Sequence, residues 1–155
     1  MFTWNFLINL VMSFIAATSF SILFNTNKRH LICIGFCGLG TYAVYHVVMV
    51  LTASPFWAAF VSSIFAALYS EFTARIRRAP TIIFLIGGII PTVPGGALFY
   101  TMKFLVLSVY DMALTKLIET LEIGLGIAGG IVTVSIIFST VSDHINKKHS
   151  EKQSH

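Results

Sequence analysis

The apolar run Ile82–Met102 is long enough to cross a lipid bilayer, but it is interrupted near its middle by Pro91, Pro94 and the pair Gly95-Gly96. Each proline lacks a backbone N–H, and its ring crowds the carbonyl four residues earlier, so a helix loses a hydrogen bond at each. Glycine weakens a helix by about 1 kcal/mol per residue. Because unpaired backbone groups in hydrocarbon cost several kcal/mol each, the break must face protein or a water-filled cavity. The sequence therefore predicts a broken membrane helix.

The composition of the whole chain also indicates a membrane protein. Of the 155 residues, 10% are charged and 56% are hydrophobic, and the mean hydropathy is +0.85. A soluble domain carries roughly 25% charged residues, so these charges are too few to cover a soluble surface. The net charge of +4 comes from short basic clusters between apolar runs, which is typical of membrane topology rather than of nucleic-acid binding. We expect a single all-α integral membrane domain over residues 1–155.

Five membrane-spanning helices are predicted within this domain. Residues 31–70 carry no Asp, Glu, Lys or Arg, and this stretch is about right for two spans of roughly 20 residues. Ser54 and Pro55 suit the start of the second of these, since Ser favours the N-cap and Pro the first helical position. Residues 109–122 are expected to form a mixed-charge connector. The predicted spans are 6–24, 31–51, 55–72, 80–108 with a break at 91–96, and 121–141.

The basic residues predict how this bundle is oriented. With five spans, eight of the ten Lys and Arg residues fall on one side, which the positive-inside rule makes cytoplasmic. The N-terminus is then outside and the C-terminus cytoplasmic, in the inner or plasma membrane. A re-entrant pair of half-helices is the alternative for the broken segment, and it would weaken this bias. The eight residues are Lys28, Arg29, Arg75, Arg77, Arg78, Lys147, Lys148 and Lys152.

The break is the candidate substrate site. A second half-helix beginning near Gly95-Gly96 would direct its free N–H groups and its positive dipole end at the break, where they suit a substrate carboxylate. Carbonyls released around residues 87–90 would accept from an ammonium or hydroxyl group. Broken helices of this kind form the binding sites of many transporters.

Two further residues follow the glycine pair on one helical face. Tyr100 and Lys103 lie four and seven residues after Gly96, so they are candidates to line the same cavity. Alternatively, Lys103 extends to the outer interface and Tyr100 is a core or interfacial aromatic residue. The candidate substrate-binding residues are Pro91, Thr92, Pro94, Gly95, Gly96, Tyr100 and Lys103.

His46 is a candidate proton relay, because an ionisable residue inside a membrane span is a functional candidate by default. The alternative is a neutral histidine bonded to another helix. Cys33 and Cys37 lie more than two turns away along the helix, so a zinc site is not expected. No carboxylate lies inside a span and no activated nucleophile is present, so we expect neither an enzyme nor a bound metal or cofactor.

Gly126 and Gly130 form a G-x-x-x-G pattern, which lets a neighbouring helix approach closely. The overlapping G-x-G-x-x-G at residues 124–129 lies inside a charge-free stretch of bilayer length and follows no strand, so it does not indicate nucleotide binding. We therefore assign Gly126 and Gly130 to helix packing.

The segment Pro91–Met102, with P-x-x-P-G-G followed by Y-T-M, resembles the threonine/serine exporter family. It is most similar to the small five-span subunit type, also described as a succinate-exporter subunit. The apolar start, the basic loop before the second span and the basic loop ending at Arg78-Ala79-Pro80 extend the resemblance over nearly the whole chain. The resemblance implies a role for Pro91, Pro94 and Gly95-Gly96, with Tyr100 in addition.

The resemblance also implies a biological context. Its members are associated with export of threonine and serine, or of dicarboxylates such as succinate, and the small type works with a larger partner that contains a related five-span half. We expect secondary export by alternating access around the break, with self-association of this chain as a further possibility. The alternative from another class is a non-transporting structural subunit that stabilises a partner transporter through its glycine-rich faces, and a channel is a third reading.

Overall fold

A computed structural model describes the backbone of residues 2–153 and the side chains of residues 4–140. This part of the chain is helical and contains no strand, which confirms the predicted all-α fold. The α-helices are α1 Phe2–Leu23, α2 Leu31–Thr52, α3 Pro55–Arg77, α4 Thr81–Ile89, α5 Gly95–Val106 and α6 Tyr110–Gln153, with short 3-10 helices η1 Lys28–His30 and η2 Ile90–Thr92.

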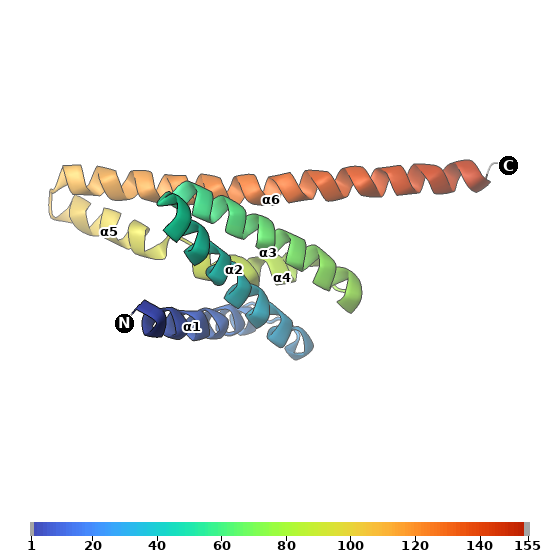
Figure 1. The fold of residues 1–155 in the computed structure, drawn as a ribbon, viewed down its shortest axis with the longest axis horizontal. Coiled ribbons are helices and arrows are strands. Elements are labelled where there is room, and N and C mark those ends of the chain that lie inside the picture. The colour runs from blue at the N-terminus through green and yellow to red at the C-terminus, as the bar shows by residue number, and fades with distance from the viewer. Residues whose placement is uncertain (1, 154–155) are drawn as a thin grey trace.

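The centre of the bundle is formed by α2, which contacts α1 on one side and α3 and α4 on others. The long helix α6 runs along the outside of this group, packs against α3, and pairs near its start with α5 (Figure 1). Small residues make these contacts close. Ala58, Ala59 and Ala66 on α3 are fully buried, as are Ile34 and Cys37 on α2. The buried core therefore lies where α2 and α3 meet each other and the helices around them.

The turn between α2 and α3 has the residues predicted for it. Ala53 closes α2 in the left-handed conformation with φ 51°, and its N–H donates to Met49 O at 2.9 Å. Pro55 occupies the first turn of α3 and Ser54 its N-cap position, but the Ser54 side chain makes no capping hydrogen bond. The position of this helix start was therefore correct, although the expected capping bond is not formed.

Among the described residues, four helices are long and apolar enough to cross a membrane, and a fifth span results if α4 and α5 are counted together. Those four are Trp4–Leu23, Lys28–Thr52, Pro55–Arg77 and Tyr110–Thr140. The broken fourth span of the sequence prediction corresponds to α4, η2 and α5. The protein is thus a polytopic helical membrane protein with a Pro/Gly-broken segment.

The predicted connector at residues 109–122 is not a separate element, because from Tyr110 onward this segment is the first part of α6. It contains neither Pro nor Gly and is rich in strong helix formers, so nothing ends the helix before the apolar section. Lys116 and Glu119 support it with an ion pair of 2.6 Å at i, i+3 spacing. The 44 residues of α6 span roughly 66 Å, about twice the hydrocarbon thickness, so the helix must extend well beyond the membrane.

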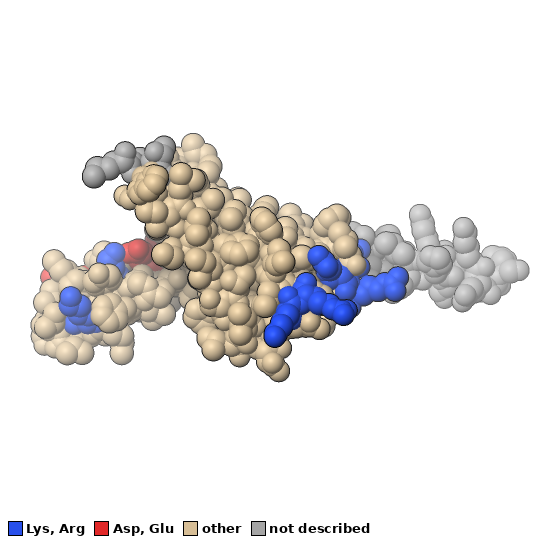
Figure 2. Space-filling view, turned by 90° about the horizontal axis from the view of Figure 1, so that it is seen from below, with Lys and Arg blue, Asp and Glu red and all other residues tan. Residues whose placement is uncertain are grey.

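Five of the described Lys and Arg residues lie in two segments, the α1–α2 loop and the end of α3. Figure 2 shows a blue group on the central body, whereas the protruding α5–α6 end carries both blue and red atoms. The group comprises the basic residues of the α1–α2 loop and of the end of α3, and we call it the basic patch: Lys28, Arg29, Arg75, Arg77 and Arg78.

Candidate functional site

The break is built from η2 and the two residues that follow it. Helix α4 ends at Ile89, η2 covers Ile90–Thr92, and α5 begins at Gly95. The axes of the two helical pieces differ by 52°. Helix α5 continues away from α4 and does not fold back along it (Figure 1). The chain is therefore bent and not reversed at the predicted position.

Pro91 anchors the break against the middle of the bundle. A Cβ placed on Gly38 of α2 would lie 3.4 Å from Pro91 Cγ and 2.5 Å from Ala17 Cβ of α1. Gly38 is the eighth residue of α2, about 10 Å along that helix. The missing side chain at Gly38 thus allows α1 to approach α2 closely. The short helix η2 contacts both α1 and α2, and Pro91 lies beside Gly38, within the spanning helices.

The carbonyl groups expected to be released by the prolines are partly satisfied within the chain. Thr92 Oγ1 donates to Ile89 O at 2.8 Å, and Val93 N–H donates to Ile90 O at 3.2 Å. Thr92 itself is buried. Two of the carbonyls in residues 87–90 are therefore already paired, and the Thr92 hydroxyl closes the end of α4 and is not directed at a solute.

The start of α5 is open. A Cβ on Gly95 or Gly96 would meet no atom within 4 Å. Pro94 occupies the N-cap position without a side-chain hydrogen bond to the helix. Gly95 N–H donates to Val93 O at 2.7 Å and Leu98 N–H to Pro94 O at 3.0 Å. The N–H groups of residues 96 and 97 lie between these two, in the first turn of α5 and at the positive end of the helix dipole.

Tyr100 and Lys103 share one side of α5. Lys103 Nζ lies 5.8 Å from the centre of the Tyr100 ring, within cation–π range. Both side chains are exposed, and α5 has its principal contacts with α6. The structure therefore places Gly96, Tyr100 and Lys103 along one uncovered helix.

His46 lies on a different part of the bundle. It is half-buried on α2, with its ring centre 4.8 Å from that of Phe6 on α1 and 6.2 Å from that of Tyr42. It is eight residues beyond Gly38, or about 12 Å along the helix. The described contacts bring His46 to α1 and not to the break.

Gly126 and Gly130 face α3. A Cβ on Gly126 would lie 2.7 Å from Phe56 O and 3.0 Å from Ala59 Cβ, and one on Gly130 would overlap the Ser63 hydroxyl and lie 2.6 Å from Phe60 O. The G-x-x-x-G face of α6 is therefore occupied by α3 of the same chain. A partner that docked on the G-x-x-x-G face would therefore have to displace α3.

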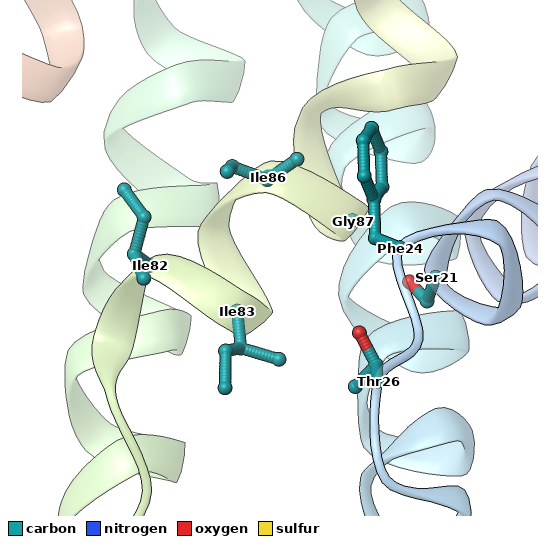
Figure 3. Close-up of a pocket in the computed structure, with 7 residues that line it drawn as sticks. All are labelled: Ser21, Phe24, Thr26, Ile82, Ile83, Ile86 and Gly87. Atoms are coloured by element: carbon teal, nitrogen blue, oxygen red, sulfur yellow. The ribbon is translucent and has the colours of Figure 1, made fainter.

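One pocket that the sequence did not predict lies between the end of α1 and α4. It has a volume of about 190 Å³ and is lined by two segments far apart in the chain (Figure 3). No local pattern could reveal it, because its walls meet only in the folded bundle. The lining residues are Ser21, Phe24, Thr26, Ile82, Ile83, Ile86 and Gly87.

The sequence also gave no reason to single out the buried hydroxyl groups. Ser21, Thr41 and Ser70 are buried, and each donates to the carbonyl four residues earlier at 2.7–2.8 Å. These hydroxyls are satisfied by their own helices. In the described part of the chain, no group of three or more His, Cys, Asp or Glu residues could hold a metal ion.

The arrangement defines the protein as a polytopic membrane protein with a broken helix of the kind found in transporters. The model of the family described as "Threonine/Serine exporter, ThrE" matches residues 9–137. The chain therefore belongs to the threonine/serine exporter family. This membership agrees with the resemblance noted at Pro91–Met102. No curated protein and no solved structure matches the chain.

Proposed function

We propose that the chain is one membrane subunit of a secondary exporter of small amino acids such as threonine and serine, or of small carboxylates such as succinate. It acts with a larger five-span subunit of the same family, and the two alternate between inward-open and outward-open states around the α4–α5 break. The N-terminus lies outside and the C-terminus in the cytoplasm of the cell membrane.

The open start of α5 is the observation that carries this proposal. Its N–H groups have no side-chain cap, and its two glycines leave the backbone uncovered. Unpaired N–H groups at membrane depth are costly unless water, protein or a solute satisfies them. A helix N-terminus of this kind favours an anionic group, such as the carboxylate shared by threonine, serine and succinate.

Lys103 and Tyr100 extend this electropositive surface. Lys103 lies seven residues beyond Gly96, so its Cα is about 10 Å further along α5. That separation is too long for one carboxylate to contact both positions. We therefore assign the start of α5 to the bound carboxylate and Lys103 to attracting anionic groups toward it or to the second carboxylate of a dicarboxylate.

The larger partner would supply the missing wall of the site. Helix α5 packs mainly on α6, and its face bearing Tyr100 and Lys103 is uncovered. Transporters are commonly built from two related halves with the solute between them. A second copy of this chain is the alternative source of that wall. His46 lies away from the break and contacts Phe6 of α1. If it serves as a proton relay, its protonation would change the contact between α1 and α2 and would not reach the bound solute directly.

The test is efflux of preloaded, labelled threonine, serine and succinate from cells that lack their own exporters. The chain is expressed alone, with the membrane protein encoded beside it, and with that protein plus Gly95→Leu. Gly124→Leu is the matched control, because a Cβ on Gly124 also meets no atom within 4 Å but lies on α6, away from the break.

We expect efflux only in the presence of the neighbour, its loss in Gly95→Leu, and its retention in Gly124→Leu at equal membrane levels. Efflux that survives Gly95→Leu would show that the break is architectural. Assembly with the neighbour but no efflux of any of the three solutes would refute the substrate class. A fluorescent protein fused to the C-terminus, which fluoresces only in the cytoplasm, tests the orientation.

A further inference from the structure

The basic patch lies at one end of the described bundle and is not matched by acidic groups. Among the residues whose side chains are described, the ion pair found is Lys116–Glu119, which lies on α6 at the other end. Glu71 is the nearest carboxylate in sequence to Arg75, one turn earlier on α3, and forms no ion pair with any residue whose side chain is described. Figure 2 shows the cations side by side on one face.

Two of the five cations are used in holding helices together. The Arg75 guanidinium lies 5.1 Å from the centre of the Phe138 ring on α6, and Arg77 Nη2 donates to Cys33 Sγ of α2 at 3.4 Å. The remaining three, Lys28, Arg29 and Arg78, are exposed. The Arg29 backbone N–H donates to Asn27 Oδ1 at 3.2 Å, which fixes the turn that presents the first two.

The α1–α4 pocket of about 190 Å³ is lined by residues that lie close in the chain to these exposed cations. Its first wall ends at Thr26, two residues before Lys28, and its second begins at Ile82, four residues after Arg78. Most of the lining is apolar, with the hydroxyls of Ser21 and Thr26 on the α1 side (Figure 3). The Ser21 hydroxyl is already bonded to Ala17 O, so the pocket suits an apolar chain better than a polar solute.

We propose that this pocket and the exposed cations together form a binding site for an anionic phospholipid. An acyl chain lies between α1 and α4, and the phosphate is held by Lys28, Arg29 and Arg78. Basic pockets between membrane helices on the cytoplasmic side bind anionic headgroups in this way. The walls of the pocket belong to membrane helices, and Ile82 and Ile86 are exposed, so the site opens toward lipid. This inference does not depend on the proposed transport.

A specific lipid site can be distinguished from a general excess of positive charge, because only the specific site requires the pocket. Positive-inside asymmetry requires cations near the headgroups but no pocket. A lipid site requires both, so filling the pocket must weaken binding while every charge is retained. This difference separates a specific lipid site from diffuse attraction.

The test uses the full-length protein, purified in detergent, and measures retained lipid by native mass spectrometry during titration with phosphatidylglycerol or phosphatidylcholine. Arg29→Gln/Arg78→Gln removes two headgroup contacts, and Lys147→Gln/Lys148→Gln removes the same charge near the C-terminus of the chain. Ile86→Trp fills the pocket, and Ile136→Trp on the exposed face of α6 is its control.

We expect phosphatidylglycerol to bind at least tenfold more tightly than phosphatidylcholine, and both Arg29→Gln/Arg78→Gln and Ile86→Trp to remove most of this preference. The two control variants should retain it. Equal binding of the two lipids, or an unchanged preference in Ile86→Trp, would overturn the proposal. If the double arginine variant does not fold, Ile86→Trp and Ile136→Trp still decide the question, because neither changes a charge.

Discussion

The two pieces of the broken helix are adjacent in the chain but are packed in opposite ways. On α4, Gly87 and Gly88 are buried, and a Cβ on either would overlap side chains of α2. On α5, Gly95 and Gly96 are exposed and would meet nothing. Glycine on α4 lets helices approach each other, whereas glycine on α5 leaves a helix start uncovered. The first pair is part of the architecture, and the second is the candidate for function.

Helix α6 contains both kinds of glycine and gives the largest expected effect. Leucine at Gly130 would overlap the Ser63 hydroxyl and the backbone carbonyl of Phe60 on α3. Overpacking costs 1–3 kcal/mol or more, and a backbone carbonyl cannot move aside as a side chain does. We expect Gly130→Leu to abolish the monodisperse peak in fluorescence-detected size-exclusion chromatography.

Gly124→Leu is the matched control on the same helix, since its added atoms enter open space. It should elute as the unmodified protein does. If both variants lost the peak, the distinction between packed and open glycines would not hold on α6.

A smaller effect is expected where α4 meets α2. Gly88→Ala places a methyl group against Cys37, whose sulfur it would overlap and whose Cβ it would approach to 3.1 Å. The gain of about 1 kcal/mol in helix propensity opposes this, so we expect a net loss of 1–2 kcal/mol in the free energy of unfolding. Chemical denaturation in mixed micelles would measure it.

Cys37→Ala provides the second arm of a double-mutant cycle. Removing the sulfur should recover most of the loss caused by Gly88→Ala, giving a coupling energy of about 1 kcal/mol between residues in contact. Additive effects of the two substitutions would show that they do not meet in the folded protein.

The sequence located the break but not its surroundings, and the reason is the range of the interactions. The end of α4 at Ile89 and the start of α5 at Gly95 follow from proline and glycine chemistry within a few residues. The start of α6 at Tyr110 was not predicted, because the charges of residues 109–122 indicated a connector before the last span, although the local propensity favours a helix. The α1–α4 pocket and the contact of Pro91 with Gly38 depend on residues far apart in the chain, and no local pattern contains them.

Replacing glycine by alanine should lower the free energy of unfolding at Gly88 of α4 but raise it at Gly96 of α5. Gly96→Ala adds a methyl group to open space, so it meets no neighbour and reduces the freedom of the unfolded chain. We expect the free energy of unfolding to rise by about 0.5 kcal/mol while efflux falls, because the methyl group covers the proposed carboxylate site. Measuring Gly88→Ala in parallel would compare the signs of the two changes in the free energy of unfolding. If both substitutions destabilised the protein, the contrast between α4 and α5 would not hold.

The smallest expected effect concerns the α5–α6 end of the molecule. The Lys116–Glu119 pair has a separation of 2.6 Å, with both side chains more than a third exposed. Exposed i, i+3 pairs contribute only a few tenths of a kcal/mol, so Glu119→Gln should lower the free energy of unfolding of the isolated chain by about 0.3 kcal/mol. The loss should shrink further in 1 M salt, because the Debye length is then only about 3 Å and interactions between exposed charges are screened.

Repeating the measurement in the complex makes this small effect informative. If the partner covers α5 and the start of α6, the pair loses water, and removing one member then leaves the other charge buried. The effect of Glu119→Gln should therefore grow and lose its salt dependence in the complex, while Glu71→Gln at the opposite end of the bundle behaves alike in both states. An unchanged, salt-sensitive effect would place the partner elsewhere and leave the open face of α5 in contact with water or lipid.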